Sequence, residues 1–342
     1  MRALPALLLL APALLSAQTE KFSLPGTDVA IYNLAGEIRA EPGTGADVTV
    51  EVTRGGADAA KLKVETGVIR SRNTLRVVYP DSRISYPAMG HHSSTSLTVN
   101  DDGTFNDNSH GRRVRITGDG SGLEASAVVR VMIPAGKKVR LNLGVGKVSV
   151  SNVNGDLYVD VSAADVSTEN TKGSLTLDTG SGETRVSKAE GSLNLDSGSG
   201  DVTLTGVHGD LLQVDAGSGE LRASDIVVDR AELDVGSGDV TIGGLRARTI
   251  KLDAGSGDVD LGLTGDVEDM NVDSGSGDVT IRIPETLGAR LDVDAGSGGV
   301  ESEMTIKVTA YESDRLVGTL GDGKGSIRIE SGSGTVHLRK AN

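Results

Sequence analysis

The sequence contains no cysteine and no tryptophan, and aromatic residues make up only 2% of its 342 residues. Without cysteine there can be no disulfide, no thiolate metal site and no anchor attached to a cysteine thiol. Aromatic side chains normally fill irregular space in a globular core. Their scarcity favours a narrow, repetitive interior built from Leu, Val, Ile and Ala, and it removes the flat platforms on which sugars stack.

Basic residues are also few, with 34 Lys and Arg against 48 Asp and Glu, so the formal charge is −14. Binding to nucleic acid depends on Lys and Arg against phosphates, and binding to an anionic membrane depends on the same side chains. We therefore expect no nucleic-acid partner. Cations and partners with basic surfaces are the electrostatically favourable alternatives.

Long hydrophobic runs are absent except at the N-terminus. Residues Met1–Ala17 have the pattern of a secretory signal, with a charge at Arg2, an apolar run over Ala3–Leu15 and a small residue at the cleavage site. The apolar run is too short to span a bilayer, and no second one follows. We expect residues 1–17 to be a signal peptide and the mature chain to be exported, to the periplasm or the cell surface, without a transmembrane segment.

What the sequence does contain is glycine, 47 residues of it, much of it in a repeated Gly-Ser-Gly tripeptide. The intervals between copies are 18, 19, 19, 19, 20, 21 and 36 residues, and we interpret the last as a double step. A fixed period of this kind is typical of one small unit stacked on copies of itself. The tripeptides are Gly180–Gly182, Gly198–Gly200, Gly217–Gly219, Gly236–Gly238, Gly255–Gly257, Gly275–Gly277, Gly296–Gly298 and Gly332–Gly334.

One repeat, Ser192–Asp210, divides into two short alternating strands and two glycine corners. Alternation turns Leu193 and Leu195 of the first strand and Val202 and Leu204 of the second to the same side. This pattern predicts an all-β fold, a single-stranded parallel β-solenoid of about ten coils of 18–21 residues over residues 137–342. At about 4.8 Å per coil the rod would be on the order of 50 Å long.

Residues 18–136 alternate less regularly, and we expect them to form an N-terminal β-rich cap region with a polar insertion at 81–123. Long polar segments of this kind in compact domains are functional loops or irregular excursions. The insertion carries His91, His92 and His110, which are metal-ligand types, but no pair has the i, i+4 spacing of a helical zinc motif. A solvated hairpin excursion is the favoured interpretation.

Stacking the repeats aligns two columns of acids beside the Gly-Ser-Gly corner, both facing solvent by alternation. The first column is Asp160, Asp178, Asp196, Asp215, Asp234, Asp253, Asp273, Asp294 and Glu330. The second column is Asp165, Glu183, Asp201, Glu220, Asp239, Asp258 and Asp278.

Two interpretations of the columns remain open. The acids can accept hydrogen bonds from backbone N–H groups at the corners, or they can collect Ca²⁺ between coils. The candidate metal ligands are Asp196, Asp201, Asp215, Asp234, Asp239, Asp253, Asp258, Asp273 and Asp278.

Acid pairs such as Asp196 and Asp201 have the chemistry of a general acid and base. However, nearly every coil carries the same pair, whereas an active site is one locally distinct constellation. No nucleophile elbow, phosphate-binding loop or zinc motif occurs. We expect no enzymatic activity and no cofactor apart from the Ca²⁺ alternative.

The segment Val29–Ile38, the segment Val131–Gly136 and the Gly-Ser-Gly-Asp-Val coils together resemble the bacterial DUF4097 family, described as an adhesin-type domain of exported, strand-repeat proteins. The resemblance implies a non-catalytic binding or scaffold protein of the cell envelope, with an envelope protein or extracellular ligand as partner. Alternatives are a structural or envelope-stress-related periplasmic protein and a cation-binding rod. We expect a monomer, because the cap region can cover one end of the stack and charged residues close the other.

Overall fold

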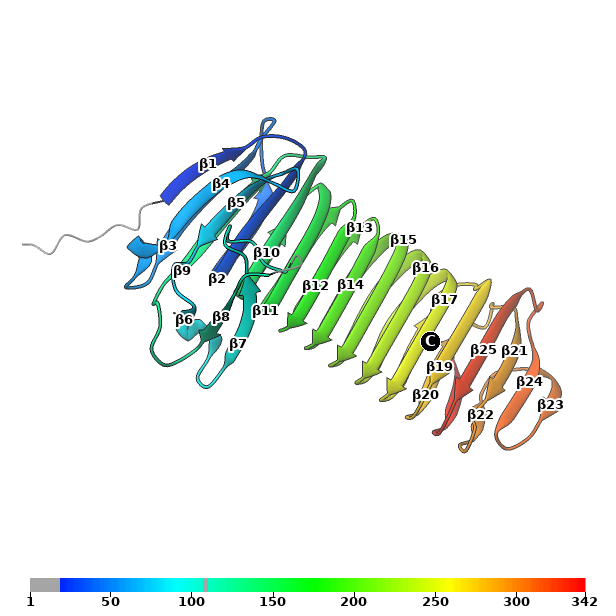
Figure 1. Cartoon of the computed structure of the whole chain (residues 1–342). Coiled ribbons are helices and arrows are strands. Elements are labelled where there is room, and N and C mark those ends of the chain that lie inside the picture. Colours follow the sequence, from blue (N-terminus) through cyan, green and yellow to red (C-terminus); the bar gives the residue numbers. More distant parts are fainter. Residues whose placement is uncertain (1–18, 107–109, 342) are drawn as a thin grey trace, which may run out of the picture.

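The protein is an elongated stack of β-strands with a broader head at its N-terminal end (Figure 1). The structure is a computed structural model that describes residues 19–106 and 110–341. The predicted signal peptide, and Asp107 of the insertion, lie outside the described residues. The all-β class is confirmed, since the helices in the described ranges are two short 3₁₀ turns, Ala59–Lys61 and Pro87–Met89.

The strands follow one another along the described chain with few long connections. In order they are β1 (Thr19–Leu24), β2 (Asp28–Pro42), β3 (Val48–Gly55), β4 (Lys63–Ile69), β5 (Arg72–Val78), β6 (Arg83–Ser85), β7 (Ser94–Val99), β8 (Arg112–Thr117), β9 (Ser126–Ile133), β10 (Lys137–Ser151), β11 (Gly155–Lys172), β12 (Leu175–Ser181), β13 (Thr184–Glu190), β14 (Leu193–Ser199), β15 (Val202–Ser218), β16 (Leu221–Ser237), β17 (Val240–Ser256), β18 (Val259–Leu263), β19 (Asp269–Ser274), β20 (Val279–Ile283), β21 (Ala289–Asp294), β22 (Val300–Ser302), β23 (Lys307–Tyr311), β24 (Arg315–Leu320), β25 (Gly325–Ser331) and β26 (Val336–Lys340).

In the middle of the rod, each strand pairs in parallel with the residues one repeat later. Leu193 lies beside Leu212 between β14 and β15, and Val202 lies beside Leu221 between β15 and β16. Leu193, Val202 and their counterparts in other coils are buried, while the residues between them face outward. Each repeat is therefore one solenoid-like coil, and the aligned apolar residues form a continuous interior whose burial stabilises the stack.

The first coil comes from the N-terminal region. β2 pairs in parallel with β10, so that Ile31 lies beside Leu141 and Gly36 beside Gly146. On its other edge β2 pairs in parallel with β5 and β9. Antiparallel strands complete this end, with β4 on β5, β3 on β9 and β1 on β3. The head thus caps the stack and also supplies its first coil.

The C-terminal end departs from simple succession, and the interpretation of the 36-residue interval as a double step is wrong. β25 pairs with β19 on one side and β21 on the other, and β26 likewise lies between β20 and β22. The last coil of the chain is therefore inserted between two earlier ones. The reason is the hairpin of β23 and β24, which pairs antiparallel with the outer side of β21 and returns the chain inward.

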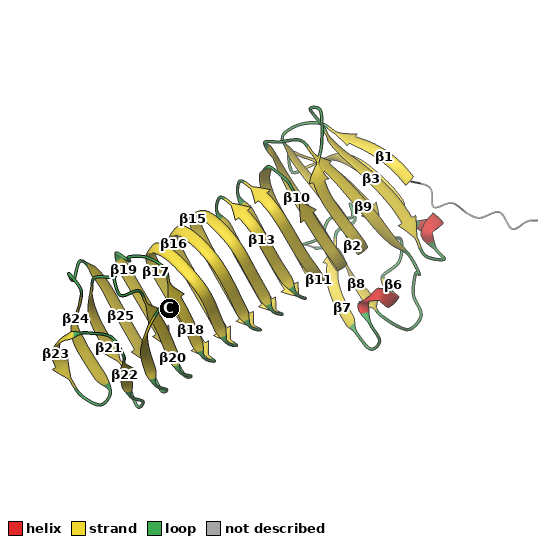
Figure 2. Ribbon diagram, turned by 180° about the vertical axis from the view of Figure 1, so that it is seen from behind, coloured by secondary structure: helices red, strands yellow, loops and turns green. Residues whose placement is uncertain are grey.

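The insertion is a small folded sheet rather than a solvated hairpin. β6, β8 and β7 form a separate three-stranded sheet with buried Ile84, Val114 and Ile116 (Figure 2). Phe105 packs edge-on against Tyr32 of β2, with 5.6 Å between ring centroids. This contact helps to cover the outer face of β2 in its first half, where residues on both faces are buried, whereas Arg39 further along the strand is exposed.

The base of the insertion is fixed to the first coil by Tyr79. Its hydroxyl donates to Asn33 Oδ1 at 2.9 Å, and Asn33 Nδ2 donates to the carbonyl of Ala127 at 2.9 Å. Burial raises the pKa of Tyr79, so the phenol stays a protonated donor. Across the described ranges we find no helix with the length and apolar character needed to span a membrane.

Candidate functional site

The Gly-Ser-Gly corner is a place where backbones of successive coils come very close. Gly200 has φ +120°, and a Cβ at this position would lie 2.1 Å from the carbonyl oxygen of Gly182 in the neighbouring coil. Gly219 and Gly238 repeat the same arrangement one coil apart. Only glycine satisfies both the positive φ and the close approach, so the tripeptide is explained by stacking.

The aspartates of the second acid column connect successive coils. Asp239 Oδ1 accepts the backbone N–H of Asp258 at 3.0 Å, Asp258 Oδ1 accepts that of Asp278 at 2.9 Å, and Asp278 Oδ1 accepts that of Thr335 at 2.7 Å. Asp165 and Asp201 accept the N–H groups of Glu183 and Glu220 in the same way, each at 3.0 Å. One oxygen of each aspartate is therefore committed to the next coil.

The glutamates of this column have different partners, and the column stops near the end of the stack. Glu183 and Glu220 form ion pairs with Arg185 and Arg222, two residues further along their own strands. In the two outermost C-terminal coils Thr335 and Gly299 take the place of the acid. The coil of Gly299 is the outermost and needs no acceptor for a further coil, whereas the coil of Thr335 is followed by that of Gly299 and lacks the aspartate.

The carboxylates of the first acid column make fewer contacts with neighbouring coils than those of the second column. Asp160 accepts a hydrogen bond from Asn106, Asp253 pairs with Lys251 at 3.8 Å, and Asp273 is within electrostatic reach of Arg328. The side-chain carboxylates of exposed Asp196, Asp215 and Asp234 make no hydrogen bond or ion pair with another described residue.

In this column, the surroundings of Asp178 change the pKa of its carboxyl group. Partial burial raises its pKa, the nearby charge of Asp196 raises it further, and a hydrogen bond from Tyr158 opposes both. The Arg140 guanidinium lies over the Tyr158 ring, 4.4 Å from its centroid. Like charges in neighbouring coils are thus felt electrostatically along this face.

Neither the acid columns nor the histidines form a cluster suited to a metal. In residues 19–106 and 110–341, no three His, Asp or Glu side chains converge as a ligand set. His91 and His92 are neighbours with ring centroids 6.4 Å apart, and His92 Nδ1 lies 3.4 Å from Asp119 Oδ2. The assignment of Ca²⁺ to the nine candidate aspartates stays a prediction.

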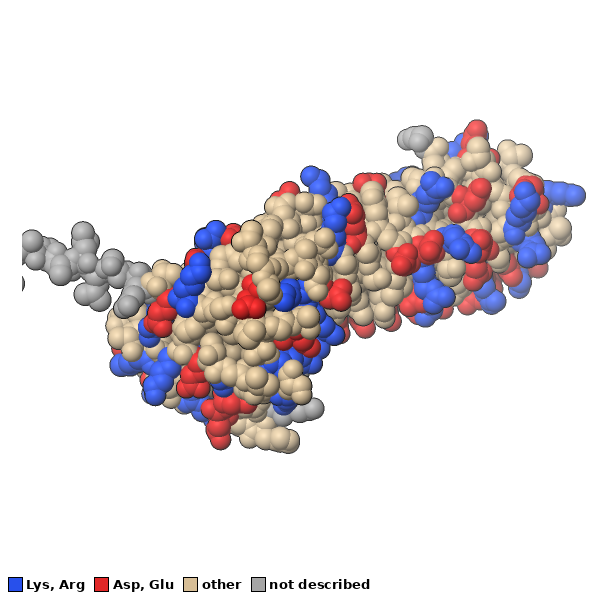
Figure 3. All heavy atoms as spheres, turned by 90° about the horizontal axis from the view of Figure 1, so that it is seen from above, with Lys and Arg blue, Asp and Glu red and all other residues tan. Residues whose placement is uncertain are grey.

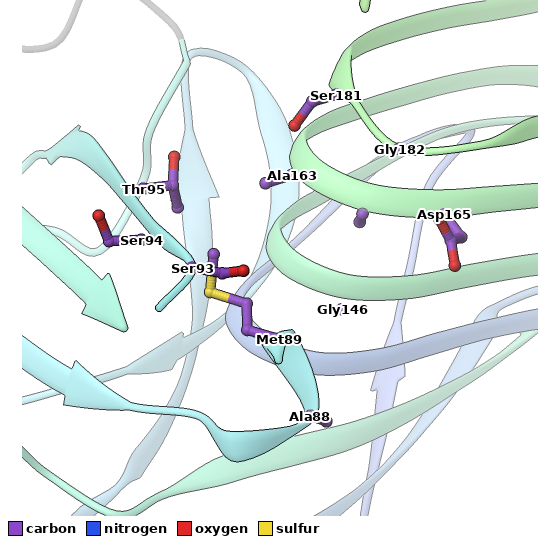
Figure 4. Close-up of a pocket in the computed structure, with 11 residues that line it drawn as sticks. Ala88, Met89, Ser93, Ser94, Thr95, Gly146, Ala163, Asp165, Ser181 and Gly182 are labelled. Carbon is purple, nitrogen blue, oxygen red and sulfur yellow. The ribbon is translucent and has the colours of Figure 1, made fainter. Parts of the chain in front are cut away.

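A groove of about 440 Å³ separates the insertion from the corners of the first coils (Figure 4). The residues that line it on the insertion side are Ala88, Met89, Ser93, Ser94 and Thr95. The residues that line it on the solenoid side are Gly146, Ala163, Ala164, Asp165, Ser181 and Gly182. We call this feature the insertion groove.

Sequence reasoning pointed to the insertion but missed the opposite wall. The signal was present, because Gly144–Gly146 and Ser162–Ala164 are the corners that depart from Gly-Ser-Gly. These irregular corners lie where the repeat faces a non-repeating element. Asp165, the carboxylate in the groove, already accepts the Glu183 N–H through Oδ1. No Lys or Arg side chain lines the groove, so it is suited to neutral or basic groups.

Comparison with known proteins gives the family. The family model described as "Toastrack DUF4097" matches residues 27–339. The chain therefore belongs to the DUF4097 family. A search of curated proteins found no match.

Among solved structures, a "putative cell adhesion protein" from Clostridium sporogenes ATCC 15579 is 12% identical, with a TM-score of 0.21. The similarity covers 95% of this chain and 99% of that one. At this TM-score the likeness supports no inference about fold or function.

Proposed function

We propose that this protein is a non-catalytic, exported binding protein of the cell envelope, and that the insertion groove is its binding site. The observation that carries the proposal is that the groove differs from every other part of the repeating stack. In the groove a non-repeating element faces the repeat and encloses a cavity of about 440 Å³, within the range of roughly 300–1,000 Å³ of ligand sites. The uniform coils offer no comparable difference from one position to the next.

The absence of catalysis is part of the proposal. In the second column, aspartates that could serve as acid or base accept backbone N–H groups of the next coil, as Asp239 accepts the Asp258 N–H. The hydroxyls of Ser93, Ser94 and Ser181 line the groove without a histidine among the lining residues to activate them. Export rests on the signal pattern of Met1–Ala17, and protease treatment of intact cells would distinguish surface from periplasmic location.

We further propose that the protein is a monomer. Antiparallel strands cover both ends of the stack, β3 and β4 at one and β24 at the other. Covered ends leave fewer parallel edges for another chain. Light scattering after size exclusion should give a single species near the mass of one chain, and a concentration-dependent dimer would contradict this.

The binding proposal is tested by blocking the groove. Ser181 lines the groove, and Ser237 occupies the equivalent corner position three coils further along, through Ser199 and Ser218. We expect Ser181→Arg to lose envelope partners that the wild type captures, whereas Ser237→Arg keeps them. Melting curves of both variants would show whether they are folded. Identical partners for all three proteins would contradict the assignment of the groove.

A further inference from the structure

One wall of the insertion groove is the edge of a β-sheet. The three-stranded sheet has the order β6-β8-β7, so β7 is an outer strand. Within the described residues β7 pairs with β8 along its whole length, from Ser94 beside Thr117 to Val99 beside Arg112. Its other side faces the groove, which Ser94 and Thr95 line.

The register fixes which backbone groups of β7 are turned to that side. Gly118 donates its N–H to the carbonyl of Ser93 at 3.0 Å, just before the paired segment. In an antiparallel pair the hydrogen-bonded positions alternate. Thr95 and Leu97 therefore bond to β8, and the N–H and C=O groups of Ser94 and Ser96 point to the outer edge.

This edge is covered at one end and open at the other. Val99 forms an isolated bridge with Phe105, and the Asn100 N–H donates to the Thr104 carbonyl at 2.8 Å. These contacts close the C-terminal part of the edge. The open part is Ser94–Ser96, and its first two residues, Ser94 and Thr95, line the groove.

The opposite wall leaves room for a backbone. Gly146, Ala163, Ala164 and Gly182 present little or no side chain toward the cavity. An added strand needs a space of about 4.8 Å beside its neighbour, with side chains alternating between the two faces. Figure 4 shows Ser94 and Thr95 on one side of this space and Ala163 and Ser181 on the other.

We propose that the insertion groove captures an extended polypeptide segment by strand addition to β7. Main-chain hydrogen bonds to Ser94 and Ser96 supply affinity, and small side chains fit against the glycine and alanine wall. A Lys or Arg of the segment pairs with Asp165 through Oδ2. The other oxygen, Oδ1, accepts the Glu183 N–H. The acidic net charge of −14 favours such a basic segment. This inference rests on the proposed function, since it names the ligand class of the same groove.

The probe is a fluorescein-labelled nonapeptide of alternating Thr and Lys, with binding followed by anisotropy. We expect Ser94→Pro to weaken binding about tenfold, because proline removes the edge N–H, while Ser237→Arg on a distant coil binds like the wild type. A peptide methylated on alternate backbone amides should also bind about tenfold less well, and this control leaves the protein unchanged. Replacing Lys by Glu in the probe should weaken binding by a similar factor.

Equal binding of the methylated and unmethylated peptides, or no binding to the wild type, would overturn strand addition. Equal binding of the Glu peptide would overturn the basic ligand class. The experiments also distinguish a failure of strand addition from a failure of the proposed function. If Ser181→Arg loses envelope partners while Ser94→Pro keeps them, the groove remains the binding site and strand addition is wrong.

Discussion

At the scale of single residues, the repeat is governed by two requirements at the corner. The third residue of the tripeptide has a positive φ, as at Gly238 with +126°, and its Cα faces a carbonyl of the coil beside it. The following aspartate accepts an N–H from the next coil. Both requirements concern stacking, and each can be tested by one substitution with a matched control.

We predict that Gly238→Ala lowers the free energy of unfolding by about 3 kcal/mol, from overpacking and the positive φ together. A Cβ at Gly238 would lie 2.0 Å from the carbonyl oxygen of Gly219. Gly45 has φ +92° with nothing within 4 Å of its Cβ position, so Gly45→Ala should have an effect of about 1 kcal/mol. Urea denaturation measures both, and equal effects would show that close approach is unimportant.

The second residue-scale prediction concerns the aspartate at the corner. Asp239→Ala removes the acceptor of the Asp258 N–H and should lower the free energy of unfolding by about 1 kcal/mol. Glu220→Ala removes an exposed ion pair with Arg222 and should have a smaller effect. If Glu220→Ala is the more destabilising in urea, the column acts through charge rather than through hydrogen bonds.

At the scale of elements, the sequence predicted the periodic part of the fold well and its ends poorly. Alternation around Gly198–Gly200 was enough to predict parallel strands, because every coil repeats the same local rules. The position of β25 depended on the non-repeating hairpin β23–β24, for which no period exists. The groove was missed for the same reason, since its walls belong to Ser93–Thr95 and Ala163–Asp165, far apart in the chain.

The inserted C-terminal coil is tested by engineered disulfides, which the absence of cysteine makes easy to interpret. Asn271 lies beside Arg328, and Arg328 lies beside Asp292. We predict that the Asn271→Cys, Arg328→Cys double variant forms a disulfide under mild oxidation, because neighbouring strands have a suitable Cα separation. The Asn271→Cys, Asp292→Cys pair, which sequential stacking would bring together, should stay reduced. The reverse pattern would show that the coils stack in the order of the chain and that β25 is not inserted between β19 and β21.

At the scale of the whole molecule, charge is the dominant surface property. Figure 3 shows carboxylates along the length of the rod with basic side chains between them. Acids outnumber basic residues by 48 to 34, so the folded rod carries net repulsion along its columns. Basic side chains such as Arg185 and Arg222 reduce it locally.

We predict that the melting temperature rises as NaCl increases from low concentration to about 0.5 M, because salt screens repulsion between the columns. Ca²⁺ and Mg²⁺ at equal ionic strength should give equal melting temperatures, since the second-column aspartates already accept backbone N–H groups. A rise specific to millimolar Ca²⁺, reversed by EDTA, would instead support cation binding by the nine candidate aspartates.

The central claim is that the repeat builds the rod and that binding takes place in the insertion groove. Photo-crosslinking in cells tests it most directly, with benzoylphenylalanine at Ser94 or Ala163 in the groove and at exposed Thr241 on a distant coil. The account predicts discrete crosslinked partners from the two groove positions and none from Thr241. Crosslinks of equal yield from all three positions would contradict it and assign binding to the surface of the coils.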